Sequence, residues 1–293
     1  MAFHRCASVF LLLAAGCAKS PPPSQFPDAR AALERMRETY ACSRGLSGEA
    51  KLDYFGDQGR VRGDLWYLVS LPNKVRLDVI SPFGATISTL TSDGTQFNLL
   101  DLRQKQFLTG PANDCNLANF TRVPMPPHAL VQLLRGEAPV LVHEASAASI
   151  AWKGGQYVVS IAGRHSAHET IELSPLDADW NKPFSEQRVI VNNVRLEQLG
   201  VPLYNVELRG HQATRTAPPR KDPDGIDPPL PPSGPSCEAP VPRRLRIEVP
   251  QGDHDLMVDN REVLHNPPLH AGAFTQETPS GVRIMSSPCQ GRP

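Results

Sequence analysis

The side chains with the most distinctive chemistry in this 293-residue sequence are its six cysteines. Thiols can form disulfides, bind metals or carry a covalent modification, and their spacing and compartment separate these outcomes. No two of the cysteines have the CxxC spacing common in zinc sites, so we expect no metal site. Disulfide bonding and modification remain, and the N-terminus of the chain indicates which cysteines do which.

The first sixteen residues have the pattern of a secretory signal. Arg5 precedes an apolar run from Ala7 to Ala15, which is too short for a permanent membrane span. The run ends in LAAGC (residues 13–17), which resembles the bacterial lipobox, whose cysteine receives fatty acyl chains such as palmitate. We therefore predict a lipoprotein signal peptide at 1–16 and lipidation of Cys17; an ordinary signal peptide cut nearby is the alternative.

The residues after Cys17 predict where the chain is held. Ala18 stands at the position where Asp favours inner-membrane retention, so we expect a lipid anchor in the outer membrane, on the periplasmic side. Residues 17–26 are rich in Pro and Ser and predict an extended tether. Residues 27–293 would then form a single β domain, with a Pro-rich exposed insertion at 217–242 that holds ten of the thirty prolines.

Four cysteines remain once Cys6 leaves with the signal and Cys17 takes lipid: Cys42, Cys115, Cys237 and Cys289. An even number in an exported chain predicts two disulfides, and four cysteines allow three pairings. We predict Cys42–Cys115, which would join the first helix to the loop after the central strands, and Cys237–Cys289, which would join the insertion to the tail.

Residues 65–109 form the central pattern of the chain. Apolar residues alternate with polar ones, and Pro or Gly ends each run, which predicts an antiparallel meander. Val75, Leu77 and Val79 share one face, while Arg76 and Asp78 point the other way. One side of this sheet is therefore expected to be buried and the other wet.

Phe83 stands at the tip of a Pro-Phe-Gly turn, where a polar residue would be the simpler choice. It could fold back onto the core or protrude towards an apolar partner. Residues 75–94 (VRLDVISPFGATISTLTSDG), with the helical segment ending LLRG at 133–136, resemble the LolA/LolB superfamily of lipoprotein carriers. In LolB a protruding apolar residue occupies a Pro-x-Gly loop, and the matching position here is Phe83.

The resemblance implies a mainly β fold. It is an incomplete antiparallel β-barrel, or half-barrel, in which an N-terminal helix and a short helix cover the concave side and an apolar cavity takes acyl chains. The residues themselves predict a helix from Pro27 to Tyr40 and another over 128–135 that stops at Gly136. Alternation predicts one face of candidate cavity residues, with Phe83 at the rim: Leu65, Tyr67, Val69, Val75, Leu77, Val79, Phe97 and Leu99.

No catalytic signature accompanies this pattern. GxSxG, HExxH, Walker and GxGxxG sequences are absent, and a formal net charge of zero leaves no footprint for nucleic acid. We therefore predict a protein that is not an enzyme and needs no cofactor. It would bind an acyl chain of a lipid or lipoprotein and possess a membrane anchor; the alternative is an interaction lipoprotein of an envelope assembly, with the same fold and a filled cavity.

Overall fold

The computed structural model describes residues 19–56, 59–222, 224–226, 228–287 and 289, so the predicted signal peptide and Cys17 lie outside it. The α-helices within these residues are α1 (Ala29–Tyr40), α2 (Asp114–Thr121) and α3 (Pro127–Arg135). The strands are β1 (Gly45–Gly56), β2 (Gly59–Ser70), β3 (Lys74–Ile80), β4 (Thr86–Ser92), β5 (Gln96–Asp101), β6 (Gln106–Pro111), β7 (Ala148–Lys153), β8 (Gln156–Ala162), β9 (Ala167–Pro175), β10 (Val189–Gln198), β11 (Val201–Arg209), β12 (Gln212–Ala213), β13 (Pro240–Val241), β14 (Arg244–Val249), β15 (His254–His265) and β16 (Arg283–Ser286).

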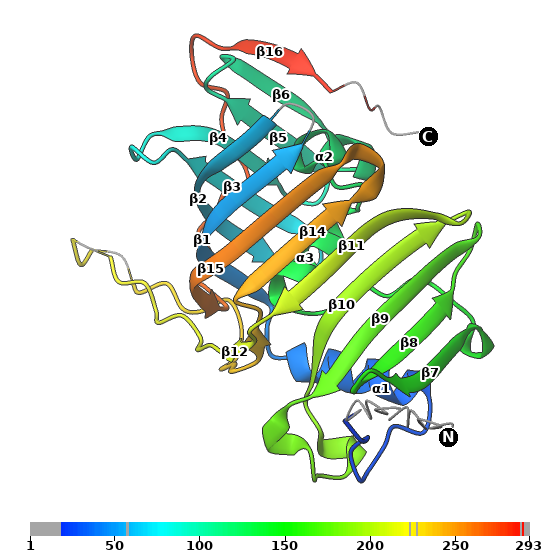
Figure 1. Cartoon of the computed structure of the whole chain (residues 1–293). Helices are drawn as coiled ribbons and strands as arrows, with labels where there is room; N and C mark the ends of the chain where they lie inside the picture. The colour runs from blue at the N-terminus through cyan, green and yellow to red at the C-terminus, as the bar shows by residue number, and fades with distance from the viewer. Residues whose placement is uncertain (1–18, 57–58, 223, 227, 288, 290–293) are drawn as a thin grey trace, which may run out of the picture.

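Fourteen of the described strands form one open sheet in the order β16-β6-β5-β4-β3-β2-β1-β15-β14-β11-β10-β9-β8-β7. All neighbours are antiparallel except β6 and β16, which run parallel. The strands at the two edges, β7 and β16, lie at opposite ends of the molecule (Figure 1). The prediction of a mainly β protein with an antiparallel sheet is confirmed, apart from this parallel edge pair.

One face of the sheet, which we call the inner face, is apolar across its width. Pairs of residues directly opposite each other on neighbouring strands show this continuity: Leu65–Val79 and Val69–Val75 between β2 and β3, Leu52–Val258 between β1 and β15, Ile247–Leu256 between β14 and β15, and Val159–Ile171 between β8 and β9. Because side chains alternate between the two faces of a strand, these residues all lie on one side.

The outer face carries charged residues that pair across strands. Asp53 on β1 accepts hydrogen bonds from Arg60 and Arg62 on β2, and Asp259 on β15 accepts one from Arg244 on β14. The Arg60 guanidinium holds the pKa of Asp53 below its usual range. Exposed ion pairs contribute little to stability, so they identify the solvent side of the sheet rather than hold it together.

Two of the helices cover separate parts of the inner face. α1 contacts β7 and β10, whereas α3 contacts β1, β2 and β3. Asp28 caps α1 by accepting a hydrogen bond from the Ala31 amide at 2.8 Å. α3 ends at Gly136, whose φ of +88° suits glycine. Both helices thus begin or end close to where the sequence predicts.

The third helix, α2, corrects the sequence prediction of a loop around Cys115. Asn113 caps this helix by accepting a hydrogen bond from the Asn116 amide at 2.9 Å. The cap is therefore the local signal for α2. Apolar periodicity does not reveal a helix this short.

A buried arginine at the end of α3 forms an ion pair there and a hydrogen bond to the end of α1. The Arg135 side chain is only 2% exposed and donates hydrogen bonds to Glu137 Oε2 at 2.8 Å and to Tyr40 O at 2.9 Å. Burial lowers the pKa of Arg135 and raises that of Glu137. Removing one partner of such a pair costs about 3–5 kcal/mol because the other charge stays buried. The pair keeps Arg135 in place, and the hydrogen bond from Arg135 to Tyr40 O joins the end of α3 to the end of α1.

Two segments that the sequence predicts as exposed are partly packed. The Pro-rich segment 217–242 is largely exposed up to residue 236, but Cys237, Ala239 and Val241 are buried, and β13 pairs with β12. At the N-terminus, Pro22 and Phe26 are buried against the domain. The described part of the predicted tether is thus not a free spacer.

The four predicted cysteines form two disulfides, but the predicted pairing is wrong. Cys42 bonds to Cys237, and Cys115 bonds to Cys289. The reason lies in the topology: the end of the Pro-rich segment returns to the residues that follow α1, and the tail passes along β6 to reach α2. The first bridge thus links the residues that follow α1 to the end of the Pro-rich segment.

Peptide mapping without reduction checks this pairing. We expect peptides containing Cys42 to be linked to Cys237, and peptides containing Cys115 to Cys289. Replacing both Cys42 and Cys237 by Ala opens a loop of 195 residues and should lower the free energy of unfolding in urea by at most about 4–5 kcal/mol. A peptide linking Cys42 to Cys115 would contradict the structure.

Glu169 on β9 is a buried acid in the other half of the sheet. It is 1% exposed, and its carboxylate accepts a hydrogen bond from the Leu141 amide at 2.9 Å. Burial raises the pKa of Glu169 to about 7. The folded protein therefore holds a proton there at pH values where the unfolded chain has lost it. The contribution of this proton to the free energy of unfolding is complete below the ordinary pKa of glutamate and is lost as the pH rises through 7.

Replacing Glu169 by Gln should remove this pH dependence, because the amide oxygen can still accept from Leu141. We compare the free energy of unfolding of the parent with that of Glu169→Gln at each pH. The difference between the two proteins should shift by about 3 kcal/mol from pH 4 to pH 8. The variant should be relatively more stable at pH 8. Urea unfolding of both proteins at the two pH values checks this, and an unchanged difference would contradict it.

Candidate functional site

An apolar cavity of about 450 Å³ lies between α3 and the inner face of the sheet. Its volume falls in the range of about 300–1,000 Å³ found for small-molecule sites. Its apolar lining comes from the sheet, from α3 and from the segment before α3: Leu52, Tyr54, Val61, Leu65, Leu77, Val79, Ile87, Leu90, Leu99, Leu108, Val123, Met125, Leu130, Leu134, Leu245, Ile247, Leu256 and Val258.

A row of four leucines crosses the sheet within this cavity. Leu77 on β3 lies opposite Leu90 on β4, which lies opposite Leu99 on β5, which lies opposite Leu108 on β6. Leu77, Leu99 and Leu108 are only partly buried although they face inwards. Apolar side chains on an inner face that remain accessible indicate space that the protein's own side chains do not fill.

One end of the cavity is closed by a row of fully packed residues. Val69, Val75 and Phe97 share the inner face with the leucine row but are 0% exposed. Tyr67 lies across the space over Gly48, and its hydroxyl donates a hydrogen bond to Asn260 Oδ1 at 3.0 Å. These side chains fill the sheet on this side, so the cavity ends there.

The other end is polar, and we call it the mouth. Ser88, Asp101 and Gln106 lie opposite one another on β4, β5 and β6. Asp101 Oδ1 accepts hydrogen bonds from the amides of residues 103 and 104, at 2.9 and 3.1 Å, which orders the turn between β5 and β6. Arg103 and Arg122 also line the cavity and place positive charge beside its apolar part.

The Pro-Phe-Gly turn connects β3 and β4. Close to the turn, Val79 on β3 lies opposite the mouth residue Ser88 on β4, so the turn is at the mouth end of these strands. The turn is held by a hydrogen bond from the Ser81 amide to Ala85 O at 2.8 Å. Gly84 has a φ of +82°, which suits glycine. The Phe83 side chain is 97% exposed, so it protrudes and does not fold onto the core.

The candidate cavity residues predicted from alternation divide into two groups. Leu65, Leu77, Val79 and Leu99 line the cavity, whereas the other four, Tyr67, Val69, Val75 and Phe97, are packed at its closed end. All eight share the inner face, and Trp66 on the opposite face is 52% exposed. Sequence reasoning did not include the lining from β14 and β15, although the alternation in residues 244–249 predicts a strand there.

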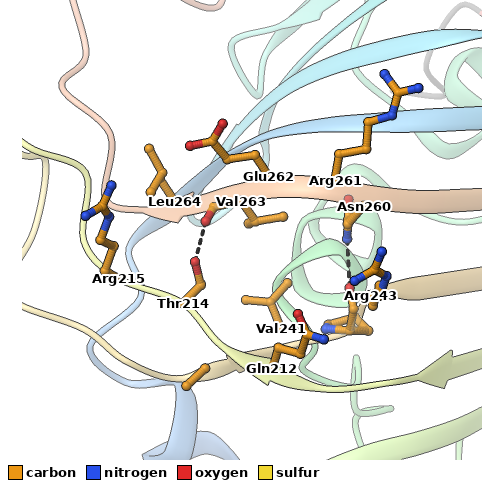
Figure 2. A pocket seen from close by; sticks show the side chains of 12 residues that line it. Gln212, Thr214, Arg215, Val241, Arg243, Asn260, Arg261, Glu262, Val263 and Leu264 are labelled. Atoms are coloured by element: carbon orange, nitrogen blue, oxygen red, sulfur yellow. Dashed lines mark hydrogen bonds between the residues drawn. The ribbon is translucent and has the colours of Figure 1, made fainter.

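A second hollow, of about 390 Å³, lies where residues 212–215 and 241–243 part from β15 (Figure 2). Asn260 Nδ2 donates to Pro242 O at 2.8 Å, and Thr214 Oγ1 donates to Val263 O. Figure 2 shows Arg215 on one side of the hollow and Arg243 on the other, so these cations do not meet at one point. The apolar cavity is therefore the better candidate site.

Two features are absent from the part of the chain that the structure describes. Its His, Cys, Asp and Glu residues nowhere gather in a group of three or more that could hold a metal ion. None of its helices is long and apolar enough to span a membrane.

Comparison with known proteins shows a likeness of fold. A DUF1329 family protein from Desulfovibrio piger is 8% identical and has a TM-score of 0.51, over 87% of this chain and 98% of that one. A LolA superfamily protein from Nitrosomonas europaea is 10% identical, with a TM-score of 0.48 over 85% of this chain and 98% of that one. A domain assigned to outer-membrane lipoprotein sorting from Vibrio parahaemolyticus is 9% identical, with a TM-score of 0.47 over 83% and 95%.

LolA superfamily structures are thus among those similar to this chain, as the strand and turn pattern predicts, and at these identities the likeness is one of fold alone. No family model matches the sequence. No curated protein matches it either.

Two substitutions on β3 test whether the cavity is empty. Val79 lines the cavity and Val75, four residues away on the same face, is fully packed. Val79→Phe should lower the free energy of unfolding by less than about 1 kcal/mol, or raise it, since the ring can enter the cavity. Val75→Phe should lower it by about 1–3 kcal/mol through overpacking. Equal losses in urea unfolding would mean that the cavity is filled.

Proposed function

We propose that this protein is an envelope lipoprotein that binds one acyl chain of a lipid or lipoprotein in the cavity under α3, without a covalent step. The observation that carries the proposal is the leucine row, in which Leu77, Leu99 and Leu108 face inwards and stay partly accessible. An acyl chain lying along this row would remove apolar surface from water, worth about 25 cal/mol per Å². The open sheet would act as an incomplete barrel with α3 on its concave side.

The two ends of the cavity support an orientation for the ligand. The packed row of Val69, Val75 and Phe97 would face the terminal methyl group. The mouth, with Ser88, Asp101 and Gln106, would face the polar group that carries the chain. Arg103 and Arg122 would favour a polar group with negative charge.

In this proposal, the N-terminus determines the membrane to which the protein is anchored. Cys17 would carry acyl chains that together hold a membrane well, and Ala18 favours the outer membrane. Phe83 would stand at the rim of the cavity, where an aromatic side chain can contact a passing acyl chain. The fold likeness to LolA superfamily structures agrees with a role in handling lipids or lipoproteins. Binding an acyl chain in this way would need no metal or cofactor.

Native mass spectrometry tests this function on a soluble chain that starts after Cys17 and is purified without detergent. We expect co-purified lipid and saturable binding of a fluorescent fatty-acid probe. Leu77→Glu should reduce probe binding at least about tenfold, because a carboxylate in the leucine row must give up water or exclude the chain. The measurement is displacement of the probe by unlabelled fatty acid.

The matched control is Trp66→Glu, which places the same charge on the outer face of the neighbouring strand, where Trp66 is 52% exposed. It should bind the probe as the parent does, and circular dichroism should show that both variants are folded. Folded parent protein with neither lipid nor saturable probe binding would overturn the proposal and favour an interaction lipoprotein with a filled cavity.

A further inference from the structure

The first described residue, Lys19, is held at three points, one on the edge strand β7 and two on the turn that follows β9. Its carbonyl accepts a hydrogen bond from Trp152 Nε1 at 2.9 Å. Its ammonium lies 4.1 Å from the centre of the Trp180 ring and 3.6 Å from Asp177 Oδ1. A cation over an aromatic face and an ion pair are each modest at a surface, but here they act on one residue.

The residues after Lys19 continue this contact. Ser24 Oγ accepts a hydrogen bond from the Phe184 amide at 2.9 Å, and Ser24 O accepts one from Gln187 Nε2 at 3.0 Å. Phe26 is 5% exposed, and its ring lies edge-on to Tyr157 with centroids 5.0 Å apart. The segment from Lys19 to Phe26 is therefore fixed to the domain along its length, and we call it the docked segment.

We propose that the docked segment sets how the protein stands on its membrane, with the β7–β8 edge against the bilayer that holds Cys17 and the cavity turned away from it. This rests on the proposed acylation of Cys17. One residue, Ala18, separates Lys19 from Cys17, and the two Cα–Cα steps between them span at most about 7 Å. The acyl chains must then enter the bilayer beside Lys19, and the domain cannot swing far on this short link.

The chemistry of the β7–β8 edge, together with the neighbouring turn after β9 that carries Trp180, fits an interface with lipid headgroups. Trp152 and Trp180 are half-buried, with ring centroids 5.9 Å apart, and tryptophan favours the headgroup level of a bilayer. The exposed Lys153 adds positive charge that attracts anionic lipid, whereas the charge of Lys19 is paired with Asp177. This edge therefore offers both an aromatic and a cationic contact near the anchor.

The cavity mouth lies far from this edge. In the sheet order, β4 with its mouth residue Ser88 is nine strand spacings from β8, roughly 43 Å along the curved sheet. Helix α1 and β7 lie at one end of the molecule in Figure 1, and β4, β5 and β6 at the other. The mouth and the Phe83 turn thus face away from the anchoring bilayer, so an acyl chain would be exchanged with another carrier or surface.

The three tryptophans of the chain allow a direct test in the acylated, full-length protein. It would be placed in vesicles of phosphatidylethanolamine and phosphatidylglycerol that contain a phosphatidylcholine brominated in its acyl chains. Trp66→Phe, which keeps Trp152 and Trp180, should lose fluorescence to the brominated lipid. Trp152→Phe/Trp180→Phe, which keeps Trp66 on β2, should not. Phe83→Trp in a chain without the other tryptophans should also keep its fluorescence.

Quenching of the Phe83→Trp chain as strong as that of the Trp66→Phe chain would overturn the inference. Hydrogen exchange of the unsubstituted protein gives a second readout in case a variant does not fold. Attachment to vesicles should protect the turn at Gly154 and Gly155 and leave residues 81–85 unchanged; the reverse pattern would also overturn it. Failure of vesicle attachment after expression would overturn the acylation on which the inference rests, while lipid binding by the soluble chain would still be decided by mass spectrometry.

Discussion

The structure depends on covering the apolar inner face of a single sheet of fourteen described strands. A strand that is apolar on one face must bury that face, and a sheet this wide needs more cover than one helix supplies. α1 covers the part near β7 and β10, and α3 covers β1, β2 and β3. Over β5 and β6, Leu99 and Leu108 of the leucine row lie beyond the strands that α3 contacts and stay partly accessible. The cavity therefore lies between α3 and the inner face, where the side chains of the sheet are not fully covered.

The position of α3 is fixed from outside the cavity. Arg135 at its C-terminal end donates to Tyr40 O and Glu137, and the cost of a lone buried charge holds this contact in place. Leu133 packs into the core, whereas Leu130 and Leu134 face the cavity. Since α3 does not rely on cavity contacts alone, its distance from the leucine row can be maintained whether or not a ligand is present.

Local patterns in the sequence were enough to predict α1, α3 and the inner face of the central strands. Val75, Leu77 and Val79 alternate with charged residues, and they do share the inner face. What could not be predicted depends on contacts between distant parts of the chain. Alternation cannot show that Val75 is packed while Val79 lines a cavity, since this depends on α3 and on strands more than 150 residues away. The disulfide pairing was wrong for the same reason, because Cys115 and Cys289 meet only through the parallel pairing of β6 with β16.

The place of β1 in the sheet has a consequence for how the chain folds. β1 pairs on one side with β2, the next strand, and on the other with β15, where Leu46 lies opposite His265. Contacts of such high sequence separation form slowly, and the second partner becomes available only when almost all of the chain has been synthesised. Until then β1 presents an unpaired edge, which is a template for pairing with other chains. The half of the sheet that holds the cavity is therefore the half most exposed to aggregation while the chain folds.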